Sequence, residues 1–104
     1  MASSKEYLGY VIEQLSCLDD ISYKSMMGEY IIYFKGKIIG GIYDDRFLVK
    51  PTSSAKRRMP QARYELPYEG AKVMLLADIL DDRERLKELL EAMYAELPEP
   101  KKKA

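Results

Sequence analysis

The chain has 104 residues, with 17 basic and 17 acidic side chains and no histidine. This length suits one small domain, since two separate cores would each be too small to be stable without metals or disulfides. The balanced charge excludes the strong field of a dedicated nucleic-acid coat or membrane-surface protein, and a hydrophobic fraction of 47% excludes wholesale disorder.

Cysteine usage and apolar runs predict the compartment. A lone Cys17 cannot close an intrachain disulfide, which favours a thiol-reducing interior. The N-terminus lacks the apolar core of a signal peptide, and the run from Val73 to Ala77 is far too short to cross a bilayer. We therefore expect a bacterial-type cytoplasmic protein with no membrane partner.

The first predicted element is a helix. Ser3 and Glu6 have the spacing of a capping box, in which both side chains bond backbone N–H groups at a helix start. Apolar residues then recur at helical steps and predict one buried stripe, formed by Leu8, Val11, Ile12, Leu15 and Leu18. The helix is expected to end at Asp19-Asp20.

The middle of the chain alternates apolar and polar side chains, which predicts an antiparallel meander of three strands. Ile21 to Phe34 is expected to be one long strand that bends or bulges at Gly28. Lys35-Gly36-Lys37 and Asp44-Asp45 predict the tight turns on either side of the second strand. The third strand then runs from Arg46 to Lys50.

Prolines separate the next elements. Pro51 stops the sheet, the hydroxyls of residues 52–54 favour a short helix through Met59, and Pro60 closes it. Residues 63–67 and 73–77 are predicted as a second, shorter strand pair. The apolar run from Val73 to Leu76 fits a buried helix equally well.

The last predicted helix is the clearest amphipathic segment. Asp81 and Glu84 repeat the capping-box spacing. The apolar side chains that follow at helical intervals are Leu86, Leu89, Leu90, Met93, Tyr94 and Leu97. Residues 98–104 cannot continue a helix and are expected to form a flexible basic tail.

The predicted order is helix, three strands, helix, two strands, helix. It indicates a single α+β domain over residues 1–97. We expect two layers, in which the first and last helices cover one face of an antiparallel sheet.

Motifs of catalysis and metal binding are weak. The aspartate pairs each lie at a helix end, a hairpin turn or a helix N-cap, where Asp bonds nearby backbone, so a structural role is predicted for Asp19-Asp20, Asp44-Asp45 and Asp81-Asp82. Cys17 has no histidine base and is predicted to be a small hydrophobic residue at a helix end. No catalytic residue and no metal site are predicted.

Gly40-Gly41 lies inside a predicted strand, where it indicates a bulge or the close approach of another backbone. The glycine spacing lacks both the dinucleotide-binding fingerprint and the Walker lysine, so no cofactor is predicted. Lys35 to Ile38 also departs from the aromatic-rich RNA-recognition signature.

One segment is locally basic. No acidic residue interrupts Lys50 to Arg63, which contains Lys50, Lys56, Arg57, Arg58 and Arg63. Residues 78–99 hold eight acidic and three basic residues, so a solvated or intramolecular electrostatic role is the first interpretation. Binding of phosphate or of an acidic partner is the second.

Nine tyrosines and no tryptophan form an unusual balance, and many tyrosines fall in the predicted sheet. Tyrosine suits half-exposed strands. Most are expected to pack within the core or across strands. An outward row that includes Tyr30 and Tyr33 would instead suit dimerisation or partner binding.

One set of residues in the middle of the chain forms a recognisable pattern: Tyr23-Lys24-Ser25-Met26-Met27-Gly28-Glu29-Tyr30, Gly36, Ile39-Gly40, Ile42, Asp44-Asp45 and Phe47-Leu48-Val49-Lys50. Through these residues the chain resembles the N-terminal domain of the TfoX/Sxy competence-regulator family. The likeness covers about Ser3 to Leu97, and its distinctive portion is Met27 to Lys50. It implies a secretion-chaperone-like fold of order helix-β3-helix-β2-helix, here without the family's helical C-terminal domain. Full-length members act as transcriptional coactivators, and their N-terminal domain offers no catalytic residues to carry over.

We therefore expect a non-enzymatic, cytoplasmic protein-interaction or regulatory module that binds a protein partner or a second copy of itself. The candidate partner-binding residues are Lys56, Arg57, Arg58, Arg63, Tyr30 and Tyr33. The alternative is a nucleic-acid-binding accessory factor in transcription or competence regulation that uses the basic segment Lys50 to Arg63. An enzyme is the least favoured class, because no catalytic constellation is recognisable.

Overall fold

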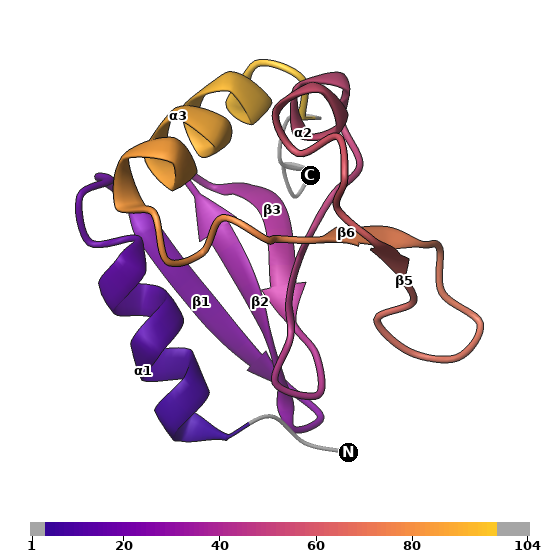
Figure 1. Ribbon diagram of the computed structural model, residues 1–104. Coiled ribbons are helices and arrows are strands. Elements are labelled where there is room, and N and C mark those ends of the chain that lie inside the picture. The colour runs from indigo at the N-terminus through magenta and orange to yellow at the C-terminus, as the bar shows by residue number, and fades with distance from the viewer. Residues whose placement is uncertain (1–3, 98–104) are drawn as a thin grey trace, which may run out of the picture.

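The computed structural model describes residues 4–97 and shows an α+β fold with three helices and six strands (Figure 1). The elements in chain order are α1 (Lys5–Gln14), β1 (Ile21–Met26), β2 (Glu29–Phe34), β3 (Lys37–Ile42), β4 (Phe47–Val49), α2 (Ser53–Arg58), β5 (Tyr64–Glu65), β6 (Met74–Leu76) and α3 (Arg83–Tyr94). All strands join one antiparallel sheet of order β1-β2-β3-β4-β6-β5. The predicted tail at 98–104 lies outside the described residues.

The predicted long strand from Ile21 to Phe34 is wrong, because the chain reverses at Met27-Gly28. Both residues have positive φ, 52° and 86°, and Met26 pairs directly with Glu29 across the turn. A two-residue turn of this kind normally carries Asn or Asp before its glycine. Met27 gives no such signal, so the sequence indicated a bend, and the order is helix-β4-helix-β2-helix with one strand more than expected.

The two turns that the sequence did predict have the same backbone geometry. Lys35 and Gly36 have φ of 52° and 85°, and Asp44 and Asp45 have φ of 53° and 56°. Around the second turn, Tyr43 and Arg46 exchange backbone hydrogen bonds of 2.9 and 3.0 Å. Positive φ at both central residues matches the right-handed twist of the flanking strands.

Two helix starts lie one residue beyond the predicted caps. Ser4 caps α1 by accepting from the Tyr7 N–H at 3.1 Å, and Asp82 caps α3 by accepting from the Arg85 N–H at 3.2 Å. Neither predicted capping box therefore forms at its predicted position, and Ser3 lies outside the described residues. Helix α1 also ends at Gln14, earlier than the predicted Asp19-Asp20.

The second half of the chain agrees with the prediction. Thr52 caps α2 by accepting from the Ala55 N–H at 3.1 Å, and the helix ends before Met59. The open choice for the run Val73 to Leu76 is settled as a strand, β6, which pairs with both β4 and β5.

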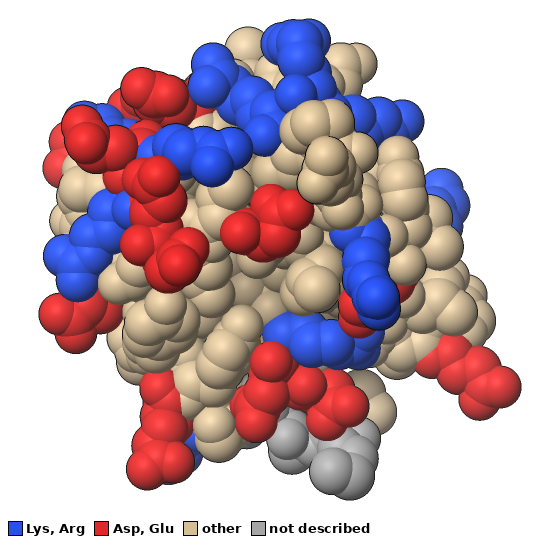
Figure 2. All heavy atoms as spheres, viewed as in Figure 1, with Lys and Arg blue, Asp and Glu red and all other residues tan. Residues whose placement is uncertain are grey.

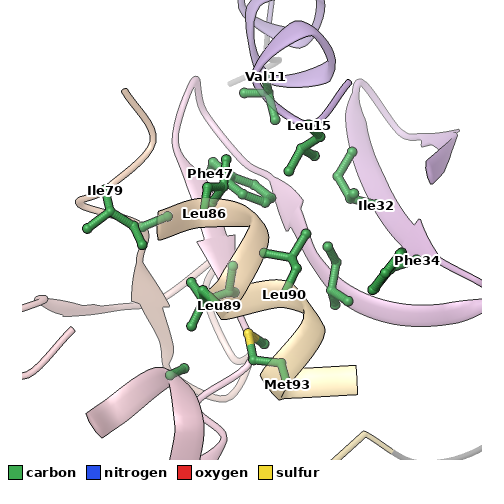
Figure 3. Close-up of a cluster of buried hydrophobic side chains, with 14 of the residues drawn as sticks. Val11, Leu15, Ile32, Phe34, Phe47, Ile79, Leu86, Leu89, Leu90 and Met93 are labelled. Atoms are coloured by element: carbon green, nitrogen blue, oxygen red, sulfur yellow. The ribbon is translucent and has the colours of Figure 1, made fainter. Parts of the chain in front are cut away.

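One apolar core joins the helices to one face of the sheet (Figure 3). Val11 and Leu15 of α1 are fully buried, as are Leu86, Leu89, Leu90 and Met93 of α3. The sheet contributes Ile32, Phe34, Ile39, Ile42, Phe47 and Val49. The apolar stripes predicted for the first and last helices are thus confirmed, although Ile12 and Tyr94 are only partly buried.

Gly40 confirms both structural expectations for the paired glycines. The register between β2 and β3 shifts at this point, since Ile32 pairs with Gly40 and Tyr33 pairs with Ile38, which leaves Ile39 as the extra residue of a bulge. A Cβ on Gly40 would lie 2.0 Å from the Leu48 carbonyl oxygen. Strand β4 therefore approaches the bulge too closely for any side chain.

We predict that Gly40→Ala destabilises the protein by about 2 kcal/mol or more, because the β4 backbone cannot move away without disturbing the core. Gly9→Ala is the matched control. A Cβ on Gly9 meets nothing within 4 Å, and replacing a glycine inside a helix with alanine stabilises by about 0.5–1 kcal/mol. Chemical denaturation measures both, and equal stability of the two variants would contradict the close approach.

Candidate interaction surfaces

Alternation along the strands divides the sheet into two faces. In β2, Ile32 and Phe34 point into the core, which lies on what we call the inner face, whereas Ile31 and Tyr33 point to the opposite, outer face. The predicted partner-binding tyrosines are therefore separated, because Tyr30 packs against the core and Tyr33 lies on the outer face. They cannot form one row.

The outer face is apolar at its centre. Ile31 and Tyr33 are half-buried, and Ile38, which pairs with Tyr33, is 38% exposed. On the neighbouring strand, Leu48 is fully buried although it points away from the core cluster. The surface therefore has an open part over β2 and β3 and a covered part over β4.

The segment after β5 packs beside Tyr43, which lies over Gly41, the residue that pairs with Leu48. The Tyr68 ring packs on Tyr43 with centroids 6.1 Å apart, and Tyr43 lies over Gly41, where a Cβ would be 2.7 Å from its ring. Arg46 holds the segment in place, since it forms an ion pair with Glu65 and donates to the Leu66 carbonyl at 3.1 Å. Tyr68 itself remains 59% exposed and borders the open part.

Burial raises the pKa of the Tyr43 hydroxyl above its ordinary value, and the nearby Tyr68, Glu29 and Tyr33 raise the pKa further. The phenol therefore stays protonated at neutral pH. It contributes a neutral hydrogen-bonding group to the outer face and not a charge.

A groove of about 540 Å³ runs between α1 and the inner face of the first two strands. It is lined by Leu8, Gly9 and Ile12 from the helix and by Tyr23, Ser25 and Tyr30 from the sheet. The Tyr23 and Tyr30 rings meet edge to face with centroids 5.8 Å apart. Tyr23 is nevertheless 51% exposed, because no further strand lies beyond β1 among the described residues.

Basic side chains gather over α2 (Figure 2). Lys56, Arg57 and Arg58 are exposed on its last turn, where positive charge also suits the helix C-terminus. Two of them have intramolecular contacts, since Arg57 donates to the Ser54 hydroxyl at 3.3 Å and Arg58 lies 3.5 Å from the Glu88 carboxylate. The intramolecular contacts support an electrostatic role within the protein. The exposure of all three side chains supports binding of phosphate or of an acidic partner.

Arg63 is exposed but belongs to a different place in the fold. Its carbonyl accepts from the Leu76 N–H at 2.9 Å, which puts its backbone beside β6 at the entrance to β5. The basic residues that are close in sequence are thus divided between a helix and a sheet edge.

No sequence pattern predicted the contact between Glu96 and α2. One carboxylate oxygen accepts from the Ser54 N–H at 2.9 Å and the other accepts from the Ser54 hydroxyl at 2.8 Å. These hydrogen bonds, together with the Arg57 charge, lower the pKa of Glu96 below its ordinary value. The side chain links the end of the last helix to the start of the short one.

Lys37 was predicted only as part of a tight turn, but its side chain makes a buried contact that the turn pattern did not predict. It is only 5% exposed, its ammonium donates to the Tyr94 carbonyl at 3.0 Å, and it lies 4.1 Å from the centroid of the Tyr94 ring. The lysine thus satisfies a carbonyl in the last turn of α3. Its two-residue spacing from Ile39 was the available signal that it faces inward.

Two of the three aspartate pairs have the structural roles predicted for them, whereas Asp19-Asp20 lies beyond the end of α1 at Gln14. Asp44 and Asp45 form a turn, Asp82 caps α3, and Asp45 accepts from the Ser4 N–H at 2.8 Å. Residues 4–97 contain no cluster of three His, Cys, Asp or Glu side chains that could hold a metal ion. Cys17 is exposed, so its prediction as a packed hydrophobic residue is wrong. The helix ends before it, at Gln14, and Cys17 lies between the buried Leu15 and Leu18.

Comparison with known proteins identifies relatives of the chain. The family model for the TfoX N-terminal domain matches residues 13–97. A protein of Spirochaeta aurantia, described as "Uncharacterized 12.7 kDa protein in trpE 5'region", is 32% identical over 102 residues, which is 97% of this chain and 89% of that protein. No solved structure gives a significant match. No helix within residues 4–97 has the length and apolar character needed to span a membrane.

We predict that Glu96→Gln lowers stability at neutral pH and that its difference from the wild type shrinks as the pH falls from about 5 to 3. The folded-state pKa of Glu96 is lowered, so its contribution is complete above the unfolded value and is lost as the carboxylate is protonated. Thermal unfolding across this pH range measures the effect. Glu91→Gln, which removes a charge from an exposed site on α3, should show no such convergence.

Proposed function

The chain belongs to the TfoX N-terminal domain family, and from this premise we propose that it is a non-enzymatic regulatory module that binds a protein partner through the outer face of its sheet. The partner we infer presents apolar side chains to Ile31, Tyr33 and Ile38. We propose for the fold the two-layer, secretion-chaperone-like arrangement that the family resemblance implies.

The observation that carries this proposal is the apolar, open part of the outer face. The helices pack on the inner face, and on the outer face Ile38 is 38% exposed while Ile31 and Tyr33 are half-exposed. Tyrosines are enriched at interfaces because one ring supplies both a large apolar area and a hydrogen-bonding hydroxyl. Tyr33 and Tyr68 offer that combination here.

A lysine at the border of the open part of the outer face indicates which charge the partner should present around its apolar centre. Lys24 pairs with Ile31 across the first two strands and therefore lies on the same outer face. It is exposed. An acidic side chain of the partner opposite Lys24 would add to specificity and to the rate of association more than to affinity.

The non-enzymatic part of the proposal is supported by the chemistry of the available side chains. The sequence contains no histidine, and two hollows of the described surface are lined mainly by charged side chains that have ordinary surface roles. The groove between α1 and the first two strands is lined mainly by apolar and tyrosine side chains. Catalysis usually brings together groups with strongly perturbed pKa values in a closed pocket. The tyrosine and glutamate shifts found here arise from burial, capping and neighbouring charge.

A second candidate function, an accessory factor that binds nucleic acid, is supported by the exposed basic turn of α2. Lys56, Arg57 and Arg58 together present positive charge on one short helix (Figure 2). Phosphate contacts from such side chains give affinity without sequence preference. The internal contacts of Arg57 and Arg58 make this surface the less available of the two.

We predict that Tyr33→Glu combined with Ile38→Glu weakens binding to the natural protein partner by at least about tenfold, since two charges would be buried in an apolar interface. The partner is recovered from the cells that express the chain and is then titrated as a purified protein. Ser16→Glu with Gln61→Glu adds the same charge at exposed sites elsewhere and should bind like the wild type. Equal binding by all three proteins would refute the outer face as the site.

The nucleic-acid alternative makes a separate prediction. Binding to a DNA or RNA duplex should fall steeply with salt, and Arg57→Glu with Arg58→Glu should reduce the slope of log affinity against log salt by about 2. Lys72→Glu with Lys87→Glu changes the net charge equally at exposed sites outside α2 and should leave that slope closer to the wild type. Failure of the wild type to bind at low salt removes this function.

A further inference from the structure

The free edge of β1 is an unused pairing surface. Strand β1 has six residues, five of them exposed, and within residues 4–97 it pairs only with β2. It contains no proline and no bulge that would turn its backbone away. Long exposed edges of this kind are templates for another strand.

The turn at Met27-Gly28 determines which backbone groups of β1 face this edge. The pair that flanks a two-residue hairpin turn, Met26 and Glu29, exchanges hydrogen bonds, and bonded pairs then alternate along the ladder. Ser22 and Lys24 therefore bond to β2. The N–H and C=O groups of Ile21, Tyr23 and Ser25 point outward.

From this pattern we infer that the protein dimerises by antiparallel pairing of β1 with β1 of a second copy, about a two-fold axis at Tyr23. In this register Tyr23 faces Tyr23 of the second copy, and each Ile21 faces the opposite Ser25. Every edge-facing backbone group of these residues then gains a partner. The two sheets become one continuous sheet.

Other symmetric registers place like charges opposite each other or leave outward backbone groups without a partner. Centring the pair on Lys24 would place like charges directly opposite each other, which destabilises a ladder. Centring it on Ser22 would leave the outward groups of Ser25 unpaired. With Tyr23 at the centre, each Lys24 instead faces the small Ser22, so the lysine selects the register and does not prevent pairing.

The second copy also supplies side chains that suit the groove between α1 and β1. Ile21, Tyr23 and Ser25 pair with Phe34, Ile32 and Tyr30, so they face the inner side of the sheet, where the groove lies. A paired strand would bring its own Tyr23 and Ile21 onto this side. Leu8, Ile12 and the exposed half of Tyr23 are apolar partners for them.

Charge does not oppose association, because the formal net charge is zero. The inferred dimer is also independent of the proposed function. It uses the edge and inner side of β1, whereas the partner surface is centred on the outward side chains of β2 and β3. Tyr33→Glu with Ile38→Glu should therefore remain dimeric.

Sedimentation velocity over a dilution series, starting at about 1 mM to detect weak pairing, tests the inference. The wild type should shift from dimer to monomer on dilution. Tyr23→Lys puts two positive charges face to face at the axis and should raise the dimer dissociation constant by at least about tenfold, an effect that salt should reduce. Tyr64→Lys is the matched control, since Tyr64 is 55% exposed on the opposite edge strand.

Ser25→Pro supplies an independent variant, because it removes an outward N–H without removing a bond to β2. It should also be monomeric with an unchanged circular dichroism spectrum, and Ser25→Ala should dimerise like the wild type. A wild type that stays monomeric at the highest concentration overturns the inference. So does a dimer that survives Tyr23→Lys in a folded protein, or one that is lost with Tyr64→Lys.

Discussion

The structure depends on three two-residue turns that set the register of strands β1 to β4. Each turn holds both of its residues at positive φ, so each strand returns directly beside the one before it. Because side chains alternate between faces, a slip of one residue would exchange the core side chains of β2 with those of its outer face. The turns thus decide that Ile32 and Phe34 are buried and that Ile31 and Tyr33 are not.

Polar side chains then attach the helices to the sheet and to the loop between β6 and α3 at specific points. The Tyr7 hydroxyl accepts from the Phe47 N–H at 3.2 Å, Gln14 donates to the Leu80 carbonyl at 2.7 Å, and Lys37 donates to the last turn of α3. Within residues 4–97 no buried side-chain nitrogen or oxygen lacks a partner. These contacts fix helix positions that an apolar stripe alone would leave free to slide.

The same arrangement accounts for where recognition surfaces remain. The helices use the inner face, and the segment after β5 packs on Tyr43 at one end of the outer face. The polypeptide between 4 and 97 leaves partly open the outer face around Tyr33 and Ile38, and it leaves the edge of β1 without a second strand. The outer face offers apolar side chains to a partner, and the edge of β1 offers backbone N–H and C=O groups. A module of this size can therefore bind a partner and pair with itself without using one surface for both.

Local chemistry was readable from the sequence wherever neighbouring residues decide the outcome. The helical stripes, the turns at Gly36 and Asp44-Asp45, the cap at Thr52 and the tight approach at Gly40 all follow from spacing, capping hydroxyls or missing side chains. Met27 shows the limit of this information, because a residue of low turn preference adopts positive φ when strand pairing on both sides holds it there. Only the tertiary structure decided which face of β2 the helices cover, that the Lys37 ammonium reaches the Tyr94 carbonyl and that Glu96 binds Ser54. Those outcomes depend on which distant elements meet, and no local pattern encodes that.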